Sequence, residues 1–180
     1  MYRLYGMSGS GNCYKPKLLL TQMGVPFACV EKDTRKGETR TPEYLAMNAN
    51  GKVPLLEITP GQYLAESNAI LCYLAEGTPY LPRDRWPRAH VMQWLFFEQN
   101  SHEPSVAEAR FIMKFLPPDH ARRADLPRLH ARGHQALAVM EQQLAEHAFF
   151  AGEQYSIADI ALYAYTHVAH EGDRKSTRLN

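Results

Sequence analysis

The first 31 residues of the chain follow the order strand, helix, strand. An apolar run at residues 2–7 predicts a strand, and residues 13–23 predict a helix that ends at Gly24. Residues 25–31 predict a second strand. Two strands joined through one helix pair in parallel by a right-handed crossover, so this segment predicts a β-α-β unit.

The chain then continues as one α/β domain. Thr41 and Pro42 have the order of an N-cap followed by a first helical residue, which predicts a short helix. An apolar run at 53–58 returns at 63–65 as a hairpin, and another helix follows. The order β-α-β, then α, then β-β-α predicts a thioredoxin-like domain over residues 1–77.

A proline-rich segment at residues 78–86 breaks this alternation and is interpreted as a linker. Beyond it, apolar residues recur at helical spacings, and Pro104 is predicted to kink the first long helix. We therefore predict a second, all-helical bundle domain over residues 87–172.

Composition limits the possible partners. With 20 basic and 19 acidic residues and a formal net charge of +1, the chain lacks the basic footprint of nucleic-acid or anionic-membrane binding. The three cysteines are odd in number and far apart, which favours reduced thiols in a reducing compartment. No signal peptide opens the chain and no apolar stretch is long enough to span a bilayer. We expect a soluble, cytoplasmic protein without a nucleic-acid or membrane partner.

A metal site is not expected. His130 and His134 have the i, i+4 spacing of two ligands on one helix face. No acidic residue lies between them and no third ligand is evident, so a packing or solvated role is favoured.

The main candidate site is the Gly/Ser-rich turn at residues 8–12. The turn lies between a predicted strand and a predicted helix, so backbone N–H groups and the helix dipole favour an anion there. Gly9 and Gly11 begin a dinucleotide-binding pattern, but Tyr14 occupies the third glycine position, which argues against a nucleotide. We interpret the anion as a thiolate.

Two other patterns keep two interpretations each. The Val53-Pro54 bond can be cis, which would leave the Val53 backbone able to pair with an extended peptide, while a trans proline at a strand start is the commoner case. Glu66 and Ser67 either cap a helix or clamp the ammonium and carboxylate groups of a zwitterion.

Other patterns are interpreted as structural. Ser156 and Asp159 have the spacing of a capping box that starts a helix. Cys13 lies one turn into a predicted helix, where a cysteine usually packs as a small apolar residue. Cys29 and Cys72 fall inside a predicted strand and helix and are expected to be buried.

Taken together, residues 10–13, 52–54, 66–67 and 156–159 resemble the cytosolic glutathione transferases in order and spacing. The chain looks like a bacterial member of that family with a serine-type or asparagine-type active site. The resemblance extends over about residues 1–172. It implies glutathione as co-substrate, no metal, a small electrophile as second substrate, and a homodimer.

The resemblance also implies which residues bind glutathione. Val53, before a cis Pro54, would pair its backbone with the cysteinyl residue of glutathione. Glu66 and Ser67 would hold the γ-glutamyl end, and Lys52 would lie near the carboxylates of the tripeptide.

The resemblance leaves the sulfur ligand open. Ser10 matches the serine that hydrogen-bonds the sulfur in related classes, and Asn12 matches the asparagine of a neighbouring group whose members often reduce disulfides. Ser8 is a third candidate in the same turn, and we favour Ser10 over Ser8. The implied function is glutathione S-transferase activity, in which a thiolate held by Ser10 or Asn12 attacks a small electrophile. The alternatives are glutathione-dependent disulfide or peroxide reduction, and a non-catalytic binding or regulatory module of the same fold.

The helical domain is expected to supply the electrophile pocket. Phe97, His102 and Phe111 are the candidates to line a cleft between the domains. Residues 173–180 are polar and without helical periodicity, whereas the family normally continues into another helix. We interpret residues 173–180 as foreign sequence appended to a truncated helical domain.

Overall fold

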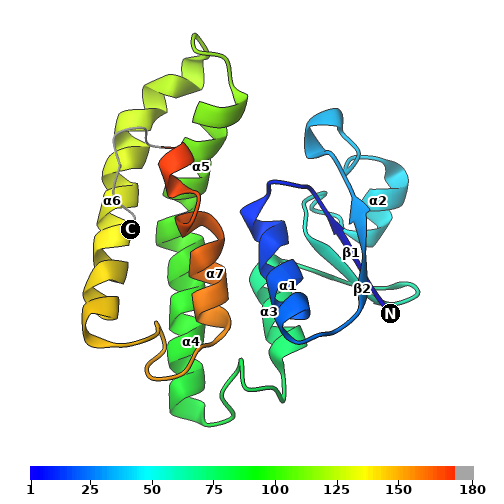
Figure 1. Cartoon of the computed structure of the whole chain (residues 1–180). Coiled ribbons are helices and arrows are strands. Elements are labelled where there is room, and N and C mark those ends of the chain that lie inside the picture. Colours follow the sequence, from blue (N-terminus) through cyan, green and yellow to red (C-terminus); the bar gives the residue numbers. More distant parts are fainter. Residues whose placement is uncertain (173–180) are drawn as a thin grey trace. The chain divides into compact units, whose positions relative to one another are not determined.

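A computed structural model of the chain describes residues 1–172. The chain divides into two compact units, Met1–Thr78 and a second that begins at Pro79. The predicted fold class is confirmed: a thioredoxin-like α/β unit is followed by an all-helical unit (Figure 1). The interpretation of residues 173–180 as a foreign tail lies outside the described residues.

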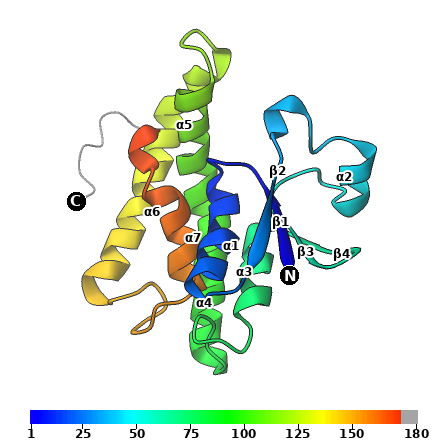
Figure 2. The same ribbon diagram turned by 45° about the vertical axis from the view of Figure 1, so that its right-hand side comes forward.

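The first unit is built on a four-stranded sheet with the order β2-β1-β3-β4. Strands β1 and β2 pair in parallel, as the β-α-β pattern predicts, while β3 pairs antiparallel with both β1 and β4. The hairpin of β3 and β4 is visible in Figure 2. The elements of this unit are β1 (Tyr2–Gly6), α1 (Gly11–Gln22), β2 (Phe27–Glu31), the short 3-10 helix η1 (Thr34–Lys36), α2 (Pro42–Met47), β3 (Leu55–Thr59), β4 (Gln62–Ala65) and α3 (Ser67–Ala75).

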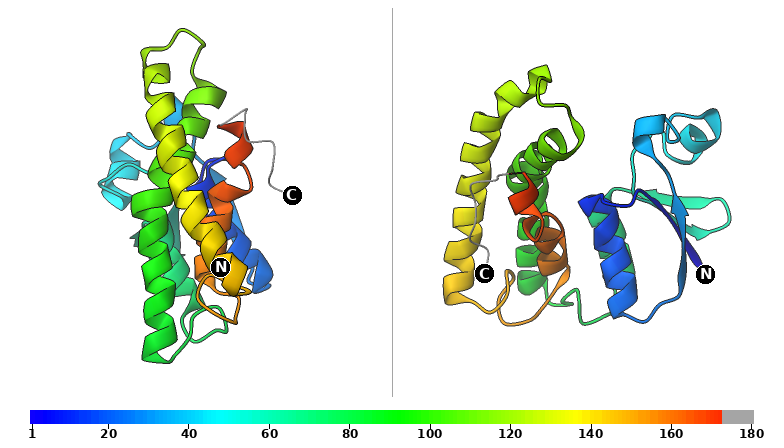
Figure 3. Two further views of the ribbon diagram at one scale, coloured as in Figure 1. Left: turned by 90° about the vertical axis from the view of Figure 1, so that its left-hand side faces the viewer. Right: turned by 45° about the horizontal axis from the view of Figure 1, so that its top comes forward.

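Helices cover both faces of this sheet. Helices α1 and α3 pack side by side on one face, and α2 lies on the other (Figures 1 and 3). On the α2 face, Tyr5, Tyr44 and Leu55 form a buried cluster. The α2 helix starts as its sequence predicts, with the Thr41 hydroxyl accepting the Tyr44 N–H at 3.3 Å.

One burial prediction in this unit is wrong. Cys29, expected to be buried, is exposed, because β2 is the edge strand of the sheet. Cys72 in α3 is half-buried.

The second unit is helical throughout its described part. Its elements are α4 (Arg85–Phe97), a π-helical turn η2 (Glu98–His102), α5 (Glu103–Phe115), the 3-10 turn η3 (Ala121–Asp125), α6 (Leu126–Glu146), α7 (Ile157–Thr166) and the 3-10 turn η4 (Ala169–Glu171). Helices α4 and α5 form one long rod beside α6 (Figure 3). Where a kink is predicted at Pro104, the structure has a π-helical turn that ends two residues earlier, because a proline has no N–H for the regular i→i−4 bond.

The predicted capping box at the start of α7 is confirmed. The Asp159 carboxylate accepts the Ser156 N–H at 2.8 Å, and the Ser156 hydroxyl accepts the Ala158 N–H at 3.2 Å. Asp159 also accepts the Phe150 N–H at 3.0 Å, so one buried carboxylate ties the preceding loop to the helix. Its role is structural.

An ion-pair cluster fastens the last turn of the described chain to α5. Glu171 accepts from Arg110 at 2.6 Å and from Lys114 at 2.7 Å. Among residues 1–172, no helix is long and apolar enough to cross a membrane.

Candidate functional site in the N-terminal unit

The register of the sheet brings three chain segments to one edge. Leu55, at the start of β3, lies opposite Tyr5 near the end of β1 and opposite Ala65 at the end of β4. The turn after β1, the Val53-Pro54 segment before β3 and the Glu66-Ser67 junction after β4 therefore lie next to one another. These are the segments in which the sequence places its candidate residues.

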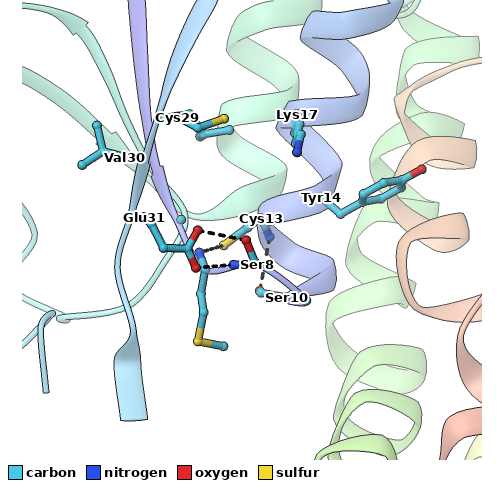
Figure 4. Close-up of a pocket in the computed structure, with 12 residues that line it drawn as sticks. Ser8, Ser10, Cys13, Tyr14, Lys17, Cys29, Val30 and Glu31 are labelled. Carbon is cyan, nitrogen blue, oxygen red and sulfur yellow. Dashed lines mark hydrogen bonds between the residues drawn. The ribbon is translucent and has the colours of Figure 1, made fainter. Parts of the chain in front are cut away.

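Ser10 is the N-cap of α1. Its hydroxyl oxygen accepts the Cys13 N–H at 3.3 Å, and its own N–H donates to the Met7 carbonyl at 3.1 Å across a turn that contains Gly9 at φ +87° (Figure 4). The Ser10 side chain is half-buried at the helix N-terminus. Because the hydroxyl oxygen serves as the acceptor, its proton is the group that can be donated to a bound anion.

Ser8 is engaged differently. Its hydroxyl donates to the Glu31 carboxylate at 3.0 Å and its N–H donates to the same carboxylate at 2.7 Å (Figure 4). The proton that a sulfur ligand must donate is thus already used at Ser8, which leaves Ser10 the better candidate in this turn.

Cys13 packs against the first strand. A Cβ atom at Gly6 would lie 3.1 Å from the Cys13 Cβ and 3.2 Å from its sulfur, so a larger residue there would force the Cys13 side chain to shift. Burial raises the pKa of the Cys13 thiol, and the Ser10 hydroxyl and the Met7 N–H only partly oppose this effect. The thiol stays protonated at neutral pH, and the interpretation of Cys13 as a packing residue is confirmed by its 7% exposure.

Asn12 points toward the Glu66-Ser67 junction after β4. Its side-chain oxygen accepts the Ser67 hydroxyl at 3.2 Å, which joins the first turn of α1 to the first turn of α3. The structure thus brings Asn12 and Ser67 together across 55 positions of sequence.

Lys15 is a site residue that the sequence analysis missed. It has no exposed surface, and its Nζ donates to the Ser67 hydroxyl at 3.2 Å and to the Asn68 side chain at 3.3 Å. A signal was present, because Gly11, Lys15 and Leu19 are spaced by four and all lie on the buried face of α1. A lysine on such a face is rarely there for packing alone.

Glu66 occupies the N-cap position of α3 without capping the helix through its side chain. It precedes α3 but its carboxylate makes no capping hydrogen bond, so the capping interpretation of this residue is wrong. Among residues 1–172, it is the one non-glycine residue with positive φ, at 67°, a conformation that costs roughly 1–3 kcal/mol. The side chain is exposed beside the buried Ser67, so a carboxylate and a hydroxyl stand together at the N-terminus of α3.

The Val53-Pro54 bond is cis, the first of the two alternatives for this segment. The carbonyl of the preceding Lys52 accepts the Tyr44 hydroxyl at 2.8 Å and the Asn48 amide at 2.9 Å. Burial raises the pKa of Tyr44 to about 12, so this hydroxyl remains a donor at any physiological pH. Two donors therefore fix the loop that presents Val53, while the Lys52 side chain stays exposed.

Arg40 adds a second cation to this loop, and the sequence analysis missed it too. Its Nη1 donates to the Asn50 carbonyl at 3.1 Å, two residues before Lys52. The close approach needs Gly51, where a Cβ would lie 2.7 Å from that nitrogen and 2.8 Å from the Thr39 carbonyl. No motif in the sequence marked Arg40, because its relation to Lys52 depends on the loop conformation.

The residues proposed for the electrophile are placed in the second unit. His102 is fully buried and its Nε2 lies 3.0 Å from the Thr166 hydroxyl, which makes it a core residue. Phe97 and Phe111 are half-buried and contact Trp94 and Phe115 respectively. In the described part of the chain, no group of three or more His, Cys, Asp or Glu residues is arranged to hold a metal ion.

Two family models match the chain. The model described as "Glutathione S-transferase, N-terminal domain" matches residues 1–76, and the model described as "Glutathione S-transferase, C-terminal domain" matches residues 123–171.

Relatives of known sequence agree with these models. Over 155 residues the chain is 34% identical to glutathione S-transferase F10 of Arabidopsis thaliana, covering 82% of this chain and 71% of the relative. It is also 29% identical over 165 residues to the disulfide-bond oxidoreductase YfcG of Escherichia coli K12, covering 86% and 74% of the two chains.

Solved structures show the same likeness. A glutathione S-transferase of Pseudomonas fluorescens Pf-5 is 52% identical, with a TM-score of 0.92 over 96% of this chain and 86% of that one. A glutathione transferase family member from the same organism, crystallised with two glutathione molecules, is 27% identical, with a TM-score of 0.83 over 94% and 77%.

Proposed function

The chain belongs to the glutathione S-transferase family, and from that premise we propose that it transfers the thiolate of glutathione to a small electrophile, with Ser10 as the sulfur ligand. The resemblance of the four short motifs already implied this activity. The observation that carries the site assignment is the junction at the N-terminus of α3, where Glu66, Ser67 and Lys15 match the two charged ends of an amino acid.

Thiolate stabilisation is the chemical task of Ser10. A thiol of pKa about 8.5 is only about 3% ionised at pH 7, and lowering its pKa by about two makes most of it thiolate. That change takes about 2.7 kcal/mol of differential stabilisation. One hydroxyl donor and the N-terminus of the 12-residue helix α1 together supply a free energy of this size.

The γ-glutamyl end of glutathione carries both an ammonium and a carboxylate. In this proposal the exposed Glu66 carboxylate binds the ammonium and the N-terminus of α3 binds the carboxylate. The Ser67 hydroxyl, which donates to Asn12 in the ligand-free protein, would turn to donate to this carboxylate when glutathione binds. Lys15, which donates to the Ser67 oxygen, keeps this side chain in place and adds positive charge on the carboxylate side.

The remainder of the tripeptide would lie along the cis-proline loop. The backbone of Val53 pairs with the cysteinyl residue, as an added strand pairs with a sheet edge. Lys52 and Arg40 supply the cations for the glycyl carboxylate.

The finer features of the protein are part of the same proposal. We place it in the bacterial, serine-type group, because Ser10 keeps a proton to donate and the relatives of known structure include a Pseudomonas enzyme. It would work as a homodimer in the reducing cytoplasm, where Cys13, Cys29 and Cys72 would stay reduced.

The test is to mix the protein with glutathione and an activated aryl halide and to identify the product by mass spectrometry. The expected product is the thioether of glutathione, formed faster than in the uncatalysed control. A rate equal to that control with every electrophile of a panel would overturn the proposal.

A second candidate is glutathione-dependent reduction of a disulfide, supported by the 29% identity to the oxidoreductase YfcG. The bound thiolate would attack one sulfur of the disulfide, form a mixed disulfide with glutathione, and release the other sulfur as a thiolate. A mixed disulfide in place of a thioether as the main product would favour this candidate.

A further inference from the structure

Parallel pairing of the first two strands places Glu31 beside the Ser10 turn. Glu31 is the last residue of β2 and lies in register with Gly6, the last residue of β1. The Lys32 N–H donates to the Gly6 carbonyl at 2.8 Å, which extends this pairing by one bond. Because the carboxyl ends of parallel strands meet at one edge, the Glu31 side chain reaches the turn that follows β1.

Both oxygens of the Glu31 carboxylate bind the same residue of that turn. Oε1 accepts the Ser8 N–H at 2.7 Å and Oε2 accepts the Ser8 hydroxyl at 3.0 Å, the two dashed lines to Glu31 in Figure 4. Hydrogen bonds to an ionised acceptor are about twice as strong as neutral ones. Two bonds to one residue also fix its orientation.

Packing contributes little to this turn. Ser8 and Gly9 are exposed, and a Cβ atom built on Gly9 would meet no atom within 4 Å. Hydrogen bonds therefore set its shape: Glu31 binds Ser8, the Cys13 sulfur accepts the Met7 N–H at 3.4 Å, and the Met7 carbonyl accepts the Ser10 N–H. Of these hydrogen bonds, those of Glu31 come from another strand, β2.

We propose that Glu31 is a positioning residue that holds the turn so that the Ser10 hydroxyl points at the sulfur of bound glutathione. This inference rests on the proposed function of Ser10. Glu31 acts through Ser8 and the turn, without touching the thiol.

Glu31 has two opposite effects on the pKa of the bound thiol, one through its charge and one through the position of Ser10, and this makes the proposal testable. A carboxylate near a sulfur opposes the thiolate, so loss of its charge alone would lower the pKa of the bound thiol. Loss of the position of Ser10 would raise that pKa. The proposal requires the second effect to prevail when Glu31 is removed.

The experiment compares Glu31→Ala with Glu38→Ala. Glu38 is a matched control, because its carboxylate likewise accepts a backbone N–H, that of Asp33, at 2.8 Å, in the loop after β2. For Glu31→Ala we expect the pKa of bound glutathione to rise by about one and conjugation at pH 7 to fall about threefold, in proportion to the loss of thiolate. Affinity for S-methylglutathione, which has no thiol, should change less than about twofold, and Glu38→Ala should match the wild type in each measurement.

Ser8→Ala is a milder variant that tests the proposal if Glu31→Ala folds poorly. Ser8→Ala removes the hydroxyl bond but keeps the backbone bond, so the thiol pKa should rise in the same direction by a smaller amount. An unchanged or lowered thiol pKa in both Glu31→Ala and Ser8→Ala would overturn the proposal.

Hydrogen exchange of the ligand-free protein separates this inference from the proposed function. The amides of Ser10 and Cys13 should exchange faster in Glu31→Ala than in the wild type and in Glu38→Ala. Equal exchange would overturn the positioning role. A wild type that does not lower the thiol pKa of glutathione at all would instead overturn the function assigned to Ser10.

Discussion

Helices α1 and α7 both begin with a serine N-cap, but only at α1 is the serine hydroxyl available to a ligand. At α7, Ser156 and Asp159 satisfy each other, and the acidic side chain is buried. At α1, Ser10 caps the helix without an acidic residue in the first turn, and its hydroxyl is half-buried. A capping serine therefore becomes a candidate ligand where its helix has no carboxylate of its own to complete the cap.

The start of α3 is a third case. Its N-cap residue Glu66 makes no capping bond, and its first residue Ser67 is instead bonded to Lys15 and Asn12 from α1. At the start of α1 the Ser10 hydroxyl keeps its proton for an anion, and at the start of α3 no side chain of the N-cap residue occupies the backbone N–H groups. The start of α7 is instead closed by its capping box. The predictions below test that contrast.

The largest expected effect is on the free energy of unfolding, through the capping box at the start of α7. Asp159→Ala removes an acceptor of the Phe150 N–H, the Ser156 N–H and the Ser156 hydroxyl, and leaves these groups buried. The free energy of unfolding should fall by about 3 kcal/mol, measured by urea denaturation. The pKa of bound glutathione should not change in the folded variant, and a shift of that pKa would contradict the structural role.

Ser10→Ala and Ser156→Ala form a matched pair. Ser10→Ala should lower kcat/KM for conjugation about 30-fold near neutral pH, about 2 kcal/mol, because the thiolate loses its hydroxyl donor. Ser156→Ala should lower the free energy of unfolding by about 1 kcal/mol and leave kcat/KM unchanged. Unchanged activity in Ser10→Ala would transfer the role to Asn12.

Ser67→Ala should act on binding. Loss of the hydroxyl removes one bond to the γ-glutamyl carboxylate, so the Kd for glutathione should rise about tenfold, measured by calorimetry. The pKa of glutathione bound at saturation should stay near the wild-type value. A changed pKa with unchanged Kd would assign Ser67 to the sulfur.

The smallest effect concerns pH and lies outside the candidate site. The Lys114 and Arg110 side chains hold the pKa of Glu171 below its ordinary value of 4.5. A lowered folded-state pKa means that this stabilisation is present above pH 4.5 and is lost as the pH falls through the folded value. Because the pair is partly exposed, the gain is about 1 kcal/mol or less. In Glu171→Gln, the loss of unfolding free energy on acidification should be smaller than in the wild type, measured by urea denaturation at a series of pH values. The same pH dependence in both proteins would contradict the assignment.

Most of the fold could be predicted from the sequence, because periodicity, N-caps and proline positions act locally. The β-α-β order, the Thr41 cap and the Ser156 box are all of this kind. The exposure of Cys29 was mispredicted, since edge position in a sheet depends on strand order, which a single strand does not encode.

The candidate site was only partly predictable. Ser10 and Asn12 lie two positions apart, and local sequence cannot say that one caps α1 while the other reaches Ser67. Lys15 had a signal in its place on the buried face of α1, but its partner Ser67 is set by tertiary structure, and Arg40 meets Asn50 only through the loop conformation. Short-range pattern identifies the segments of a site, and long-range packing decides the direction of its side chains.

The most direct test of the central claim is a pH titration of the thiolate absorbance of glutathione bound to the wild type and to Ser10→Ala. The predicted result is a bound thiol in the wild type that ionises about two pH units below free glutathione, with most of that difference lost in the variant. Bound glutathione that ionises no earlier than free glutathione in the wild type would contradict the account.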